Sequence, residues 1–114
     1  MITTILFDLD GTLLPLDESR FIQLYFGGIA KRFTSLGYDG KKLLSAILES
    51  TDATIANDGS MRNVERFWTS FALLFPSNLA KLEQEFSLFY LRDFPVVQQS
   101  STLQPLAQKA IRML

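Results

Sequence analysis

The residues best suited to chemistry lie near the start of the chain, in the segment Phe7-Asp8-Leu9-Asp10-Gly11-Thr12-Leu13. Asp8 and Asp10 stand two positions apart, so an extended backbone would point both carboxylates to the same side. Two neighbouring carboxylates repel each other unless a cation holds them, and Mg²⁺ suits one or two carboxylates together with water and phosphate oxygens. Gly11 allows a tight turn whose N–H groups can face an anion, and the hydroxyl of Thr12 adds a donor. The segment therefore favours chemistry on a phosphate group.

An ordinary turn is the competing interpretation, because Asp-Gly after a strand is a common turn signal. The specified string is longer than that, since it fixes two Asp, one Gly, one Thr and one Leu in order. At ~5% for each residue type, such a string arises by chance about 3 times in 10⁷ start positions. The functional interpretation is therefore favoured over a simple turn.

The element that must position these aspartates is the segment Ile2–Phe7, which is short, apolar and rich in β-branched residues. It predicts a strand buried on both faces, as in a parallel sheet, with the aspartates at its carboxyl end. Open α/β sheets bind their ligands at that end. A single strand needs neighbours for its backbone groups, and no second convincing strand follows. We therefore expect the chain to be the N-terminal part of a longer α/β protein.

Helical periodicity dominates the rest of the sequence. Four amphipathic helices are predicted between Asp17 and about Phe94, and Gly27-Gly28 in the first of them predicts close approach by a neighbour. The spacing of the Phe and Trp residues in the third helix favours core packing over a ligand pocket. A link of weak strand character, residues 96–100, leads to a further helix at about Ser101–Leu114, where Ser101 and Gln104 could form a capping box.

Composition excludes several classes of function. Hydrophobic residues make up 47% and charged residues 20%, with a net charge of −1, so we expect one packed core and neither nucleic-acid nor membrane partners. The absence of Cys and His excludes thiol nucleophiles, Ser-His relays and imidazole or thiolate metal sites. Any metal would be a hard ion with oxygen ligands. No secretion signal or membrane-length apolar run is visible, so a cytoplasmic location is expected.

The segment Asp8-Leu9-Asp10-Gly11-Thr12-Leu13 resembles the first motif of the haloacid dehalogenase (HAD) superfamily of phosphatases and phosphotransferases. That motif, Asp-x-Asp-Gly-Thr-Leu, ends the first strand of a Rossmann-like sheet, and a helical cap follows it in many members. The resemblance implies an α/β parent fold, of which this mostly α chain would be one part. Residues 1–16 would be the first core strand and catalytic loop, 17–94 the helical cap domain, and 95–114 a linker and the start of the returning core helix.

The resemblance also implies a role for each motif residue. Asp8 matches the nucleophile that forms an aspartyl-phosphate, and Asp10 matches the general acid/base. The Asp8 carboxylate and the Asp10 backbone carbonyl match two Mg²⁺ ligands. The N–H groups of Leu9 and Asp10 and the hydroxyl of Thr12 match positions that hold the phosphoryl group, while Gly11 shapes the loop.

Two further residues, Arg20 and Gln23, stand in the first turns of the first cap helix. They would either be exposed at a helix start or contact the substrate when the cap closes. The family's later motifs are a Ser or Thr, a Lys and an acidic pair, and none is recognisable here. We therefore expect these 114 residues alone to be inactive as a phosphatase.

Three functions stay open at this level. The first is a Mg²⁺-dependent phosphatase acting on a small phosphorylated metabolite, with this chain as its N-terminal portion. The second is a phosphomutase built on the same motif. The third is a non-enzymatic helical module that self-associates through exposed core surface.

Overall fold

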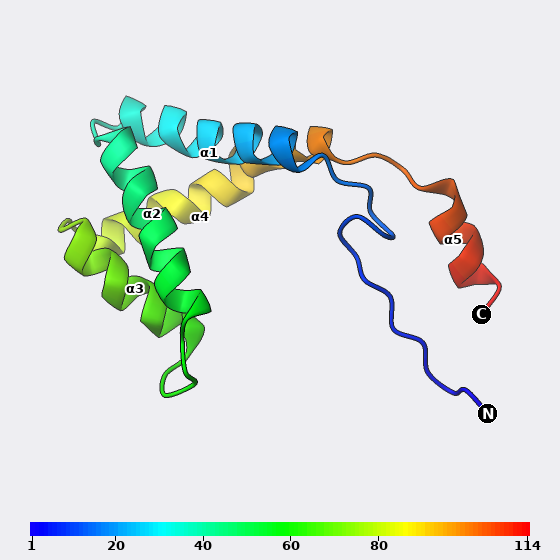
Figure 1. Cartoon of the computed structure of the whole chain (residues 1–114). Helices are drawn as coiled ribbons and strands as arrows, with labels where there is room; N and C mark the ends of the chain where they lie inside the picture. Colours follow the sequence, from blue (N-terminus) through cyan, green and yellow to red (C-terminus); the bar gives the residue numbers. More distant parts are fainter.

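A computed structural model describes all 114 residues, and the chain is mostly helical. Figure 1 shows α1 crossing the top of the molecule, whereas residues 1–14 and the last helix hang away at one end. None of the helices combines the length and apolar character needed to cross a bilayer. The elements are α1 (Glu18–Ser35), α2 (Gly40–Ile55), α3 (Asn63–Leu74), α4 (Leu79–Arg92), the 3-10 helix η1 (Phe94–Ser100) and α5 (Pro105–Arg112). Helices α1–α4 and η1, which packs along α1, are called the helical body below.

Polar side chains fix where three of these helices begin. Asp17, Asp39 and Asn78 each accept a hydrogen bond from the N–H group three residues further on, at 3.0, 3.1 and 3.2 Å. Such caps satisfy N–H groups that have no partner inside the helix. Gly37, at φ +92°, takes the left-handed conformation that lets the chain turn after α1. The predicted start of the first helix at Asp17 is confirmed.

The core of the helical body combines four Phe with five aliphatic residues. Phe71 and Phe75 are buried, as the sequence predicts, while Phe67 and Trp68 are only half-buried. Arg32 also joins α1 to the middle of α4 through Glu85 at 3.2 Å and to the end of α4 through Asp93 at 3.0 Å. The core residues are Ile29, Phe33, Leu43, Ala46, Ile47, Phe71, Phe75, Leu82 and Phe89.

The strand predicted for residues 2–7 does not form, so that prediction is wrong for this chain. Every residue from Met1 to Thr12 is exposed, and the structure contains no sheet. The only β-type pairings are two isolated bridges, one between Asp10 and Leu14 and one between Leu16 and Ser101. The physical reason is that an extended segment keeps its regular form only when neighbouring strands bond its N–H and C=O groups.

The C-terminal part also differs from the prediction. Residues 96–100 belong to η1 and have no strand character. Helix α5 begins at Pro105, where the Gln104 side chain accepts a hydrogen bond from the N–H of Leu106, so the predicted capping box with Ser101 is wrong. Ser101 is instead paired with Leu16. No residue of α5 is buried, which leaves its apolar stripe in contact with solvent.

Candidate active site

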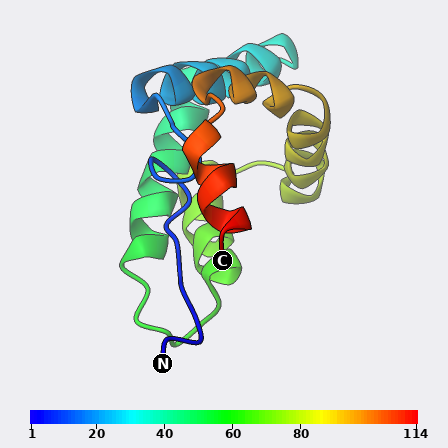
Figure 2. The same cartoon turned by 90° about the vertical axis from the view of Figure 1, so that its right-hand side faces the viewer.

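The chain enters and leaves the helical body through two segments that lie side by side. The N–H of Asp17 donates to the carbonyl of Ser100 at 2.7 Å, and the N–H of Thr102 donates to the carbonyl of Pro15 at 3.3 Å. Ser100 is buried, and its hydroxyl donates to the carbonyl of Val97 at 2.6 Å. The pairing anchors both the segment that follows the aspartates and the segment that leads to α5 at the same end of the body. Figure 2 looks onto this end, with α5 and the N-terminal segment nearest the viewer.

Residues 8–14, called the aspartate loop below, close on themselves. The N–H of Leu14 donates to the carbonyl of Leu9 at 2.9 Å, and the N–H of Gly11 donates to the carbonyl of Leu14 at 2.8 Å. Gly11 has φ +76°, a conformation that glycine adopts without strain. The N–H groups of Leu9 and Asp10 donate to no backbone carbonyl. Both N–H groups are therefore without a backbone partner within the chain.

A pocket of about 480 Å³, called the junction pocket below, lies where the aspartate loop meets the helical body. Asp10 lines it, while Asp8 and Thr12 do not. Both aspartates are exposed to solvent. The lining residues are Asp10, Leu14, Leu16, Glu18, Phe21, Ile22, Phe94, Val97, Gln98, Ser100 and Ser101.

The α1 residues that line the junction pocket are not the ones that the sequence analysis named. Arg20 and Gln23 are exposed and lie outside the lining of the junction pocket, whereas Phe21 and Ile22 belong to it. Gln98 of η1 was not predicted either. The sequence carries little sign that these three residues line a pocket. Phe21 and Ile22 look like ordinary core positions, and Gln98 lies in a link with no clear periodicity.

The charges around the junction pocket are acidic. Asp10 and Glu18 line it, and no Lys or Arg does. A phosphate monoester dianion would be repelled by these carboxylates unless a cation compensated them, since like charges a few ångströms apart interact by several kcal/mol near a protein surface. The pocket can place a group beside Asp10, but its own lining supplies no positive charge for a phosphate.

The chain also lacks a complete set of ligands for a metal ion. Mg²⁺ demands a nearly octahedral set of oxygen ligands, and the chain gathers no group of three acidic side chains that could hold an ion. Asp8 and Asp10 supply carboxylates of the right kind but too few of them. These residues alone do not fit a complete magnesium site.

Comparisons with known proteins add no relative. No family model matches the chain, and neither the curated proteins nor the solved structures include a significant match.

Proposed function

We propose that this chain supplies the catalytic loop and helical cap of a HAD-type phosphatase, a phosphoric monoester hydrolase acting on a small phosphorylated metabolite. The observation that carries the proposal is the string Asp8-Leu9-Asp10-Gly11-Thr12-Leu13, folded as a closed loop with two free N–H groups beside a pocket. The paired segments around Leu16 and Ser101 support the cap assignment, because a domain inserted into another leaves and re-enters it at neighbouring points.

The chemistry would divide between the two aspartates. A carboxylate oxygen of Asp8 attacks the phosphorus, forming an Asp8–phosphate bond while the bond from phosphorus to the ester oxygen breaks. Asp10 gives its proton to the departing alkoxide, which leaves as an alcohol. Asp10, now ionised, takes a proton from water as the water oxygen attacks phosphorus and the bond to Asp8 breaks. Inorganic phosphate forms, and both aspartates return to their starting state.

The parts that this chain lacks would have to come from outside these 114 residues. Phosphoryl transfer depends on positioning and on neutralising the charge of the phosphate oxygens. Mg²⁺, if further acidic ligands complete its site, would supply that charge, together with a cationic side chain. The exposed apolar residues of the N-terminal segment and α5 are consistent with a missing sheet, since an α/β core would cover both.

The proposal is tested on the protein purified from its native cells, in whatever length and assembly it has there. We expect hydrolysis of para-nitrophenyl phosphate in the presence of Mg²⁺, and no measurable turnover in Asp8→Asn, because an amide is a poor nucleophile. Asp10→Asn should lower turnover by about 10²- to 10⁴-fold, the usual contribution of general acid/base catalysis. Asp52→Asn, a change to an exposed acid on α2, is the matched control and should retain the wild-type rate. Turnover by Asp8→Asn within tenfold of the wild type would refute the nucleophile assignment.

Self-association is a second candidate, which one observation favours. Leu6 of the N-terminal segment and Leu103 ahead of α5 are 91% and 95% exposed, and they belong to a group of large apolar residues at one end of the molecule. Exposed apolar surface of this kind marks sites of interaction. A concentration-dependent mass in light scattering, reduced by Leu6→Ser, would support this function, and a clean monomer would count against it.

A further inference from the structure

The helical body contains a second cavity that shares no residue with the junction pocket. This cavity, called the inner cavity below, has a volume of about 410 Å³ and is lined by ten residues from all four helices α1–α4, nine of them hydrophobic. Ligand sites in proteins typically enclose ~300–1,000 Å³, with mainly apolar and aromatic walls and a few polar groups. The cavity opens to solvent, since Leu48, Thr51 and Tyr90 of its lining are exposed. The inner cavity therefore has the dimensions and the lining of a small-molecule site.

Aromatic rings form most of its wall. Tyr25 and Phe26 come from α1, Trp68 from α3, and Phe86 and Tyr90 from α4. The indole of Trp68 meets the ring of Phe86 edge to face at 6.3 Å between centroids. Trp68 and Phe86 are only half-buried although they belong to the body of the protein, so apolar ring surface is left without protein contacts. A flat aromatic molecule could stack on such surface.

No charged residue lines the inner cavity. Burying an ionised ligand group without a charged or well-placed polar partner is costly, so the walls select against ions. Apart from the hydroxyls of Tyr25 and Tyr90, the lining has one polar side chain, that of Thr51. Its hydroxyl already donates to the carbonyl of Ile47 at 2.8 Å. An uncharged ligand is the one that these walls favour.

The hydroxyls of Tyr25 and Tyr90 supply the polar part of the site. They hydrogen-bond to each other across α1 and α4. Each hydroxyl has one hydrogen, and the bond between them uses one of the two, so the other can be donated to an acceptor outside the pair. Burial raises the pKa of the Tyr25 hydroxyl, which keeps it protonated as a donor. A carbonyl oxygen is a suitable acceptor.

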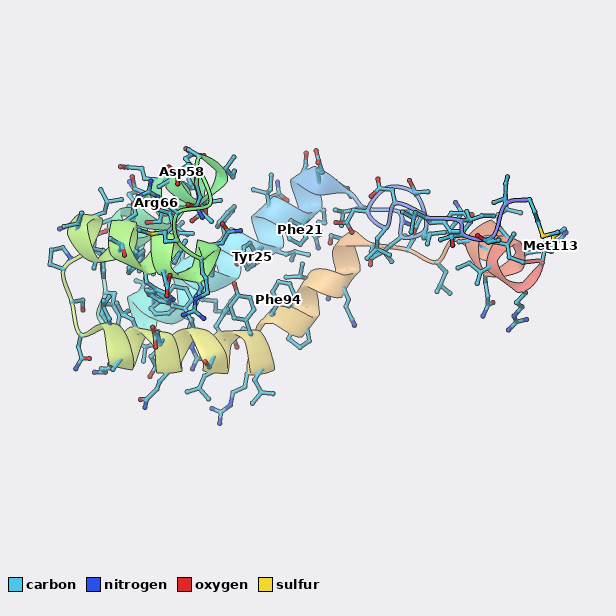
Figure 3. All side chains as sticks on the ribbon, turned by 90° about the horizontal axis from the view of Figure 1, so that it is seen from below. Phe21, Tyr25, Asp58, Arg66, Phe94 and Met113 are labelled. Carbon is cyan, nitrogen blue, oxygen red and sulfur yellow. The ribbon has the colours of Figure 1, made fainter.

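Neighbouring rings separate the two sites. Tyr25 of the inner cavity contacts Phe94 of the junction pocket with centroids 5.5 Å apart, and Phe21 stacks on Tyr25 at 5.6 Å. Figure 3 shows these three side chains together between α1 and η1. A molecule in the inner cavity would thus lie behind the aromatic wall of the junction pocket, away from Asp10.

We propose that the inner cavity binds an uncharged aromatic small molecule that carries a carbonyl group, with its rings against Trp68 and Phe86 and its carbonyl accepting from the Tyr25–Tyr90 pair. This site is independent of the phosphatase proposal, because none of its residues belongs to the aspartate loop.

Trp68 makes the binding directly measurable, because it is the only tryptophan of the chain and it lines the cavity. The probe is Prodan, an uncharged fluorescent naphthyl ketone, added to the full chain while quenching of Trp68 and energy transfer to the probe are recorded. We expect saturable quenching at a ratio of one probe to one chain. Anilinonaphthalene sulfonate has a similar aromatic body with a negative charge, and it should bind at least about tenfold more weakly because its charge would be buried.

Two variants separate this site from other apolar surface. Thr51→Phe places a ring at the cavity wall from an exposed helix position and should weaken Prodan binding by about tenfold, with the helical circular dichroism spectrum unchanged. Tyr90→Phe removes one hydroxyl and should weaken binding by about three- to tenfold, the usual net value of one hydrogen bond. Leu91→Ser, at an exposed apolar position of α4 outside the cavity lining, is the control and should bind like the wild type. Equal affinity for the two probes, or unchanged Prodan binding in both cavity variants, would overturn the proposal.

Discussion

Asp8 and Asp10 differ in their surroundings although only one residue separates them. Asp10 lines the junction pocket, while Asp8 lies outside that lining, and both side chains are exposed to solvent. In the proposed function, Asp10 would be the proton donor and Asp8 the nucleophile.

Tyr25 gives a prediction about pH at the residue scale. Burial and the hydrogen bond between the Tyr25 and Tyr90 hydroxyls raise the pKa of the Tyr25 hydroxyl above the ordinary value of 10.0. The unfolded chain therefore loses this proton at pH values where the folded chain keeps it, and stability that is fully present below about pH 10 is lost as the pH rises further. Denaturant unfolding of the wild type and of Tyr25→Phe, measured from about pH 9 to about pH 11, should show a steeper loss in the wild type. Parallel curves would contradict the assignment.

Helix α1 carries two adjacent glycines, Gly27 and Gly28, and close packing accounts for only one of them. A Cβ atom at Gly28 would lie 3.2 Å from the ring of Phe89, which is 1% exposed and held by the core. A Cβ atom at Gly27 would meet nothing within 4 Å. The close approach predicted from the sequence is therefore confirmed at Gly28 and absent at Gly27. Packing against Phe89 explains Gly28, and no contact explains Gly27.

This difference predicts opposite responses to alanine at the two positions. Gly27→Ala should raise the free energy of unfolding by about 1 kcal/mol, because alanine loses less backbone entropy in a helix interior. Gly28→Ala should gain nothing or lose stability, because the Phe89 ring must shift within a packed core. Urea unfolding of both variants beside the wild type measures the two changes. Equal stabilisation by both would show that the ring gives way freely.

The helices were predictable from the sequence for a local reason. Asp17, Asp39 and Asn78 cap helices with groups a few residues away, so the signals and the elements they control lie together in the chain. The strand at residues 2–7 depends on partners that the sequence cannot supply locally, and it does not form. η1 was missed because it depends on packing against α1 instead of on its own periodicity.

Only the part of the candidate site that belongs to the sequence motif around Gly11 could be predicted from the sequence. Asp10 was identified from the string around Gly11, and the structure places it in the junction pocket. Phe21 and Gln98 reach the same pocket from elements far apart in sequence, so their meeting is a tertiary property that no local pattern records. Sequence reasoning finds residues whose chemistry is unusual and passes over those that reach a pocket through tertiary position alone.

At the scale of the whole molecule, the chain has a packed helical body and a sparsely packed end. The molecule measures 53 × 35 × 22 Å along its principal axes. At the open end, Ile2–Ile5 and Leu114 line a shallow cleft of about 320 Å³, and the body contributes no residue to it. The aspartate loop thus lies between the packed helical body on one side and exposed apolar segments on the other.

This arrangement predicts that the 114 residues alone have no appreciable phosphatase activity. The lining of the junction pocket is acidic and the chain completes no metal site, so the charge of a phosphoryl group in transfer stays uncompensated. Hydrolysis of para-nitrophenyl phosphate with and without Mg²⁺ should match the buffer. A Mg²⁺-dependent rate of about 1 s⁻¹, typical of enzymes, that disappears in Asp8→Asn would prove the chain sufficient and this prediction wrong.

The central claim is that Asp8 carries the phosphoryl group, and trapping the covalent intermediate tests it most directly. The native protein is mixed with a phosphate ester and treated with borohydride, which reduces an aspartyl-phosphate to homoserine, and the peptides are then sequenced by mass spectrometry. We predict homoserine at position 8, none at position 10, and none without the ester. Turnover that proceeds with Asp8 unmodified, or homoserine at another aspartate, would contradict the claim.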